Sequence, residues 1–182
     1  MSAPRELVER LEAAVHLSGC ALQEVGGDAL RGRELLEQVE MAARTLRSAG
    51  VRKGDLVLSR ALRGRALVIG LLGTWSCDAA AAAIEAPVAP AELEAILRDL
   101  QAGFLLEADA AGKLKCTRRT PSGRRLPADT AMVKLTSGST GRSRGIAVGA
   151  SHLIADGRQV IAAMRIHPGD INIAAIPMSH SY

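Results

Sequence analysis

The sequence predicts an α/β fold with a mostly parallel sheet flanked by helices. Short apolar runs alternate along the chain with helical patterns of roughly 10–15 residues, an order typical of βαβ units. Hydrophobic residues make up 48% of the 182 residues and charged residues 23%, a balance typical of a globular protein. Aromatic residues make up only 2%, so we expect a core of leucine, isoleucine, valine and alanine.

Several segments carry the apolar spacing or composition of helices. The expected helices are 4–17, 33–48, 64–75, 91–100 and 151–166. Capping residues support three of them: Gly50 follows the second helix, Pro90 precedes the fourth, and Ser151 is a candidate N-cap of the fifth. The third segment is apolar on nearly all sides, as expected of a helix packed on a sheet, and we interpret Trp75 within it as a core residue.

Short apolar runs predict the strands. The expected strands are 55–59, 79–84, 103–107, 131–135, 145–148 and 171–176. The run 79–84 is rich in alanine, which has a low propensity for strands. The polar, basic stretch 108–129 is expected to form a loop or a hairpin, and Gly26, Gly27 and Asp28 mark a turn.

The net charge is +4, and much of the positive excess lies in one stretch of the chain. Its basic residues are Lys113, Lys115, Arg118, Arg119, Arg124 and Arg125. Binding of single-stranded nucleic acid relies on aromatic side chains as stacking platforms, and this stretch has none. We therefore expect a solvated segment and no nucleic-acid partner.

Cysteine spacing and hydropathy exclude further classes. Cys20, Cys77 and Cys116 lie far apart, which indicates neither a zinc ribbon nor a disulfide scaffold and fits a reducing, cytoplasmic location. The first ten residues are rich in charge and lack an apolar run, so no signal peptide is expected. The longest apolar stretch, 66–84, is interrupted by Asp78, so no membrane span is expected.

The most informative stretch is the loop Leu135–Gly145, with the sequence LTSGSTGRSRG. Its glycines let the backbone fold tightly and expose N–H groups, its hydroxyls are short donors, and its arginines add positive charge. Such a concentration of donors suits a polyphosphate. The loop lacks the lysine of a Walker A motif, because Arg142 follows Gly141, and it lacks the G-x-G-x-x-G pattern. A flexible polar turn remains the alternative at this point.

The loop resembles the phosphate-binding signature of the adenylate-forming enzymes, [ST]-[ST]-G-[ST]-T-G-x-P-K-G. This superfamily includes acyl-CoA synthetases, luciferases and the adenylation domains of nonribosomal peptide synthetases. The matching residues are Thr136, Ser137, Gly138, Ser139, Thr140, Gly141 and Gly145. The segment 176–182 is similar to a second family motif, P-x-x-H-x-[YF]-G, and the segments 34–55, 71–75 and 90–93 are similar to the family's early helices and turns. The resemblance thus spans nearly the whole chain, in the family's order.

The resemblance implies an ATP-dependent carboxylate ligase. Such enzymes join a small-molecule carboxylic acid to the α-phosphorus of ATP, release pyrophosphate, and pass the acyl group to coenzyme A or to phosphopantetheine on a carrier protein. It implies that the matched loop residues bind the ATP phosphates, with Ser139 and Thr140 as hydroxyl donors and Arg144 beside the leaving pyrophosphate. It also implies that His180, Ser181 and Tyr182 line the acyl-substrate pocket.

The resemblance further implies that residues 1–182 are the incomplete N-terminal part of the adenylate-forming large domain. The adenine pocket, the ligands of Mg²⁺ and a mobile C-terminal domain would then lie outside the chain. We therefore assign no catalytic residue and no metal ligand within it, and we expect the isolated chain to be inactive.

The loop departs from the family pattern at two positions, where Ser143 replaces a proline and Arg144 replaces a lysine. Two alternatives therefore stay open, a non-catalytic phosphate- or nucleotide-binding module and a pseudoenzyme. Retention or loss of ATP affinity would separate them.

Overall fold

The computed structural model describes residues 3–15, 22–60, 62, 64–84, 88–109, 112–119, 126–136 and 144–175. Its helices are α1 (Ala3–Val15), α2 (Gly32–Ser48), α3 (Gly64–Ser76), α4 (Pro90–Leu100) and α5 (Ala150–Met164). Its strands are β1 (Leu22–Gln23), β2 (Ala29–Leu30), β3 (Leu56–Arg60), β4 (Ala80–Ile84), β5 (Phe104–Ala108), β6 (Leu114–Arg118), β7 (Thr130–Thr136) and β8 (Arg144–Gly149). The expected helices and all but the last of the expected strands are confirmed.

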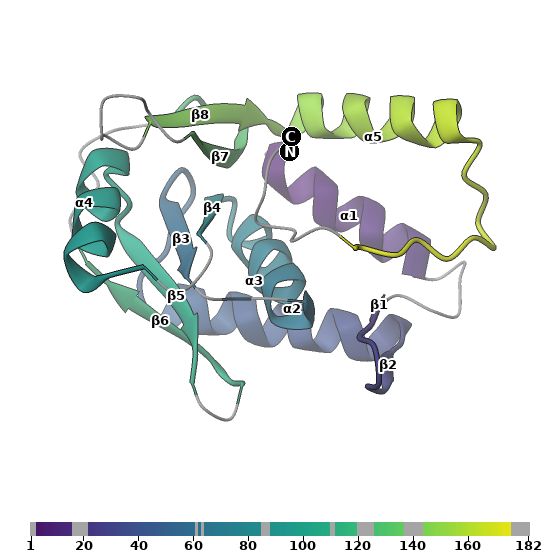
Figure 1. Cartoon of the computed structure of the whole chain (residues 1–182), viewed down its shortest axis with the longest axis horizontal. Coiled ribbons are helices and arrows are strands. Elements are labelled where there is room, and N and C mark those ends of the chain that lie inside the picture. The colour runs from purple at the N-terminus through teal and green to yellow at the C-terminus, as the bar shows by residue number, and fades with distance from the viewer. Residues whose placement is uncertain are drawn as a thin grey trace.

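Most of the strands form one sheet, in the order β6-β5-β3-β4-β7-β8 (Figure 1). Strand β3 pairs in parallel with β4 and β5, and β4 pairs in parallel with β7. The outer pairs, β5–β6 and β7–β8, are antiparallel. The predicted parallel sheet is therefore confirmed at its centre, and an antiparallel strand flanks it on each side.

Helices cover both faces of the parallel centre. In β3, Leu56 and Leu58 pack against α4, whereas Val57 lies in a cluster to which α2 and α3 contribute. Figure 1 shows α4 on one side of the strands and α1, α2 and α3 on the other. Covering on both faces explains the alanine-rich strand β4, because small side chains such as Ala80 and Ala82 let helices approach the sheet closely.

Helices α2 and α3 cross with no side chain between them at Gly73. A Cβ atom on Gly73 would lie 2.7 Å from the Cβ of Ala42 and 3.2 Å from the backbone nitrogen of Ala43. Both alanines are buried. The two helix backbones are therefore in direct contact, and this contact determines where α3 lies over the sheet.

The expected glycine cap of α2 is confirmed. Gly50 follows the helix with φ of +96°, a left-handed conformation that glycine adopts without steric cost. The Val51 N–H donates to the Leu46 carbonyl at 3.1 Å, which ends the helix and turns the chain toward β3.

The expected turn at Gly26–Asp28 closes a small hairpin of β1 and β2 that docks on the start of α3. The Glu24 carboxylate accepts a hydrogen bond from the Arg65 backbone N–H at 2.9 Å, and the Arg65 guanidinium donates to the Asp28 carbonyl at 2.6 Å. Strands β1 and β2 have two residues each, which is too short for a periodic apolar pattern. The sequence therefore predicted the turn but not the two strands.

The basic stretch that follows β5 forms the expected hairpin rather than a loop alone. Asp109 and Lys113 are joined by a backbone hydrogen bond of 2.9 Å, and β6 returns antiparallel to β5. Lys115 is exposed, and Arg119 forms an ion pair with Glu94 of α4. Charged side chains on an edge strand disfavour pairing with another chain.

Two expectations near the end of the chain are wrong. Residues 171–175 form no strand, and Ile171 and Ile173 are 90% and 84% exposed, so none of the described strands or core residues supports extended pairing there. Ser151 is not the N-cap of α5, because the helix begins one residue earlier and Gly149 takes that position. The Ser151 hydroxyl instead donates to the Asp129 carboxylate at 2.7 Å.

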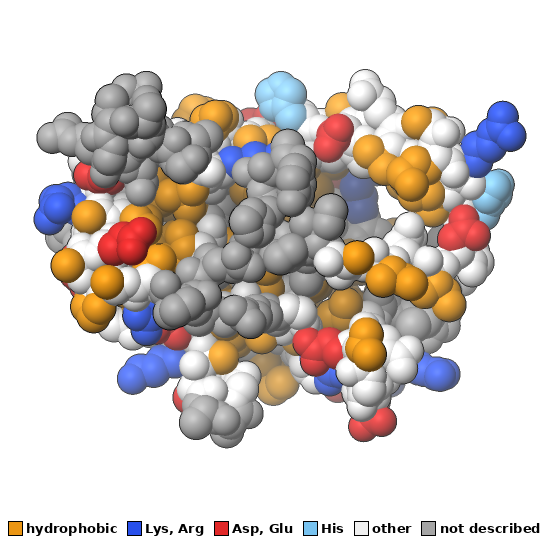
Figure 2. Space-filling model, viewed as in Figure 1, with side chains coloured by type: hydrophobic (Ala, Val, Ile, Leu, Met, Phe, Trp, Pro, Cys, Tyr) orange, Lys and Arg blue, Asp and Glu red, His pale blue; other side chains and the backbone are white. Residues whose placement is uncertain are grey.

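Apolar side chains are exposed on α5 and on the segment that follows it. Figure 2 shows them gathered at the right of the molecule. On α5 they include Val160, Ile161 and Met164, and Ala150 is the buried residue of that helix. Among the described residues, no helix has both the length and the hydropathy needed to cross a membrane.

We predict that Gly73→Ala destabilises the protein, because the added methyl group meets backbone atoms of α2 that cannot move aside. The expected loss in the free energy of unfolding is about 1–3 kcal/mol. The matched control is Gly157→Ala on α5, where a Cβ meets nothing within 4 Å. That substitution should raise stability by about 0.5–1 kcal/mol through helix propensity. Urea unfolding of both variants measures the difference, and equal effects would contradict the close contact.

Candidate functional site

The candidate site lies at the carboxyl ends of the parallel strands. Strands β3, β4, β5 and β7 end at Arg60, Ile84, Ala108 and Thr136, and parallel strands end at one edge of a sheet. In open α/β sheets, ligands bind beyond this edge. The loop singled out in the sequence begins there, directly after β7.

The structure brings the two ends of the predicted phosphate loop together. Thr136 pairs with Arg144, and Leu135 pairs with Gly145, in the antiparallel register of β7 and β8. Both ends of the segment 137–143 therefore lie at the carboxyl edge of the parallel strands.

Most of the predicted phosphate-binding residues lie outside the described residues. These are Ser137, Gly138, Ser139, Thr140 and Gly141. Thr136, Arg144 and Gly145 are described as strand residues. The predicted acyl-pocket residues His180, Ser181 and Tyr182 also lie outside the described residues. The assignment of all these residues to a ligand therefore stays a prediction.

Gly145 has a packing role that the family pattern does not indicate. A Cβ atom at this position would lie 2.6 Å from Cγ1 of Val133 and 2.8 Å from Cδ2 of Leu100. Both neighbours are buried, and Val133 is β-branched and stiff. The missing side chain lets β8 lie against β7 beneath the end of α4.

Among the described residues, Arg60 and Lys134 are cations at or near this edge, and their surroundings differ. Arg60, at the end of β3, forms an ion pair with Glu107 of β5, which neutralises its charge. Lys134 lies on β7 two residues before Thr136 and is half-buried. No carboxylate among the described residues pairs with Lys134, so its positive charge is available to an anion near the loop. Successive residues of a strand point to opposite faces of the sheet. Because Val133 packs in the cluster with α4, Lys134 lies on the other face of the sheet.

Trp75 is partly buried and packs against a core cluster instead of lying within it, and it also makes a contact that the sequence did not predict. Its indole Nε1 donates a hydrogen bond of 2.8 Å to the carbonyl of Ala131, in β7. The same ring packs among the side chains of α2 and α3. Helix α3 is therefore tied to the strand that leads into the loop.

The described residues offer no metal centre and no activated thiol. No group of three or more histidine, cysteine, aspartate or glutamate side chains gathers in them. Burial, with the nearby Cys77 thiol as a smaller cause, raises the pKa of Cys116 to about 11. Burial also raises the pKa of Cys77. Because the thiolate is the nucleophile, neither thiol is suited to accept an acyl group at neutral pH.

Comparison with known proteins decides the family. The AMP-binding enzyme family matches residues 12–182. The chain belongs to this family. Bacitracin synthase 3 of Bacillus licheniformis is 28% identical over 137 residues, which cover 66% of this chain and 2% of that protein.

This AMP-binding chain has the same fold as parts of several solved structures. MatB from Rhodopseudomonas palustris, in its ATP-bound structure, matches with a TM-score of 0.77 and 19% identity, over 99% of this chain and 41% of that chain. The NpsA N-terminal subdomain of Klebsiella oxytoca, in complex with 3-hydroxyanthranilyl-AMSN, matches with a TM-score of 0.64 and 20% identity, over 82% of this chain and 41% of that chain. This chain thus spans about two fifths of the length of either structure.

We predict that Gly145→Ala destabilises the protein by about 1–3 kcal/mol, because its methyl group overlaps the Val133 side chain. Val133→Ala removes the nearer of the two overlapping atoms and leaves the flexible Leu100 side chain to adjust. The double variant should therefore be more stable than the sum of the two single changes predicts. Urea unfolding of the three variants measures the coupling. Strict additivity, or a Gly145→Ala variant of unchanged stability, would contradict the packing role.

We predict that Cys116 resists alkylation in the folded protein. With a pKa of about 11 instead of 9.0, its thiolate fraction at pH 8 falls about a hundredfold. Iodoacetamide labelling followed by mass spectrometry measures the rate, with the urea-unfolded chain as the control. Labelling of folded Cys116 at the rate of the unfolded thiol would contradict the raised pKa.

Proposed function

We propose that this chain is the phosphate-binding part of an ATP-dependent carboxylate ligase. The observation that carries the proposal is the pairing of Thr136 with Arg144, which brings the two ends of the motif together at the carboxyl edge of the parallel strands in a member of the AMP-binding family. The donors of this loop would hold the β- and γ-phosphates of ATP. His180, Ser181 and Tyr182 would line the acyl-substrate pocket.

The proposed reaction has two steps. A carboxylate oxygen of the acid attacks the α-phosphorus of ATP, the bond from that phosphorus to the bridging oxygen breaks, and pyrophosphate leaves with the electron pair. A thiolate of coenzyme A or of phosphopantetheine then attacks the acyl carbonyl carbon, and AMP leaves with the bridging oxygen. In the first step, negative charge shifts onto the leaving pyrophosphate, where positioned donors lower the barrier.

Within this chain, the roles divide by residue chemistry. Ser139 and Thr140 would donate hydroxyl hydrogen bonds to phosphate oxygens, and Arg144 would stabilise the leaving pyrophosphate with its forked guanidinium. The half-buried Lys134 would add positive charge next to the loop. Mg²⁺ would neutralise phosphate charge when bound, and we propose that its ligands lie outside the described residues.

Similar proteins support this proposal. The solved structures include an ATP-bound MatB and an NpsA subdomain in complex with 3-hydroxyanthranilyl-AMSN. Because this chain spans only 41% of each of those chains, we assign it the phosphate-binding part of the reaction and propose that it is inactive in isolation. We propose a cytoplasmic location, where ATP and acyl acceptors are present.

We predict that Thr140→Ala slows acyl-adenylate formation about tenfold to a hundredfold. The reason is the loss of one hydrogen bond to a charged phosphate, which is worth about 1.5–3 kcal/mol. Pyrophosphate release in the natural full-length protein measures the rate. The matched control is Thr45→Ala on α2, whose hydroxyl donates to the Met41 carbonyl far along the chain from the loop. Equal rates for Thr140→Ala and the unsubstituted protein would contradict the phosphate role.

Equilibrium binding of MgATP separates the proposal from its alternatives. A full-length protein that binds MgATP and releases pyrophosphate with a carboxylic acid is the proposed ligase. Binding without turnover of any acid identifies a nucleotide-binding module. Loss of binding identifies a pseudoenzyme, in which Ser143 and Arg144 no longer support the family's chemistry.

A further inference from the structure

Strand β7 contains a bulge close to its start. Thr130 pairs with Gly149 and Met132 pairs with Val148, so Ala131 has no partner on β8. A residue added to one strand of an antiparallel pair bends that strand and shifts which face each later side chain occupies. The bulge therefore determines how β7 continues to Thr136.

The bulged residue is held by the Trp75 indole. Ala131 is 0% exposed, so its carbonyl cannot turn to solvent for a donor. The Trp75 Nε1–H supplies one at 2.8 Å. On its other side, β7 pairs with β4 at Ala81 and Met132, the residue that follows the bulge, so Ala131 itself has no register partner on either neighbouring strand.

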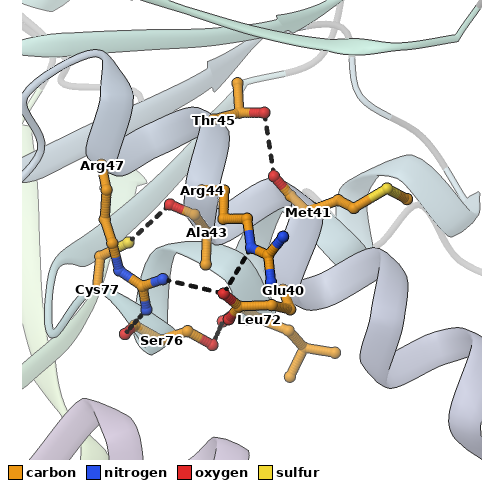
Figure 3. Close-up of polar contacts among 9 residues, drawn as sticks. All are labelled: Glu40, Met41, Ala43, Arg44, Thr45, Arg47, Leu72, Ser76 and Cys77. Atoms are coloured by element: carbon orange, nitrogen blue, oxygen red, sulfur yellow. Dashed lines mark hydrogen bonds and ion pairs between the residues drawn. The ribbon is translucent and has the colours of Figure 1, made fainter.

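Trp75 can act as a fixed donor because the end of α3 is anchored to α2 (Figure 3). The Arg47 guanidinium donates to the Ser76 carbonyl at 3.1 Å and contacts the Glu40 carboxylate at 3.4 Å. The Cys77 thiol contacts the Ala43 carbonyl at 3.5 Å. A cation at the C-terminus of a helix is also favoured by the helix dipole. The two residues that follow Trp75 in the chain are thus held by α2.

The register of β7 determines which side chains face the core and which residues pair at the two ends of the loop. With the observed bulge, Val133 packs in the α4 cluster and Lys134 lies on the other face. A slip of one residue would exchange these faces and move a charged side chain into the core. The same slip would change the pairing of Thr136 with Arg144, where the loop begins and ends.

We propose that Trp75 is a positioning residue for the nucleotide loop: its indole N–H holds the bulged Ala131 carbonyl and so fixes the register in which β7 and β8 present Thr136 and Arg144. This inference rests on the proposed function for its effect on ATP. Its effect on strand register does not depend on ATP.

The test is Trp75→Phe in the full chain, which keeps an aromatic ring but removes the donor. We expect amide exchange in residues 132–136 and 144–148 to accelerate about tenfold, while exchange in β3 stays unchanged. We also expect the dissociation constant for MgATP to rise about tenfold, because small displacements of binding groups are costly. The control is Ser76→Ala, which removes a neighbouring hydroxyl that donates to the Leu72 carbonyl at 2.9 Å and should change neither quantity.

A second variant separates the hydrogen bond from the shape of the ring. Trp75 is the single tryptophan of this chain, and benzothienylalanine placed there exchanges the N–H for sulfur at nearly constant shape. It should reproduce both effects of the phenylalanine variant, and it serves as the test if that variant does not fold.

The outcomes are distinct. Unchanged exchange in β7 and β8 overturns the inference. Faster exchange with unchanged MgATP affinity also overturns it, because Trp75 would then be structural only. If the unsubstituted chain does not bind MgATP, the proposed function fails instead, and the exchange comparison still decides whether the indole fixes the register.

Discussion

The direct contact between α2 and α3 at Gly73 supports much of the rest of the structure. With no side chain between the helices, α3 has one position over the sheet, and the residues that follow Gly73 are placed by it. Beyond α3, Asp78 adopts a left-handed conformation with φ of +57°, and its carbonyl accepts a hydrogen bond from the Gly54 N–H at 3.0 Å. The turns before β3 and β4 are thereby joined, and both strands enter the sheet in register.

The candidate site depends on this framework at a distance. Trp75 extends from α3 to the bulge in β7, and β7 leads into the loop. Preorganised donors contribute to catalysis only when the protein already holds them in place before the substrate binds. The residues at the two ends of the loop are Thr136 and Arg144, which pair with each other. The β7–β8 pair, the Trp75 hydrogen bond and the packing around Gly145 hold those ends.

The cations at the same edge of the sheet differ in whether a carboxylate neutralises them. The Arg60 guanidinium is neutralised by Glu107, whereas Lys134 has no carboxylate partner among the described residues. A half-buried cation without a partner costs solvation free energy, and binding of an anion would offset that cost. The basic hairpin after β5 is different, since Lys113, Lys115 and Arg118 are exposed and Arg119 pairs with Glu94.

Local patterns in the sequence sufficed for the helices and the parallel strands, because hydrophobic periodicity and glycine caps are carried by neighbouring residues. The loop motif is local in the same way, and its phosphate role stays a prediction. The alanine-rich strand β4 was predicted despite its low propensity, and its burial on both faces explains why it forms. Contacts between distant segments were not predictable in this way. Residues 171–175 of the expected strand 171–176 pair with none of the described strands, Ser151 bonds to Asp129 instead of capping its helix, and Trp75 reaches Ala131 across 56 residues of chain. Hydrogen-bond partners of this kind depend on which segments the fold brings together, and no local pattern records them.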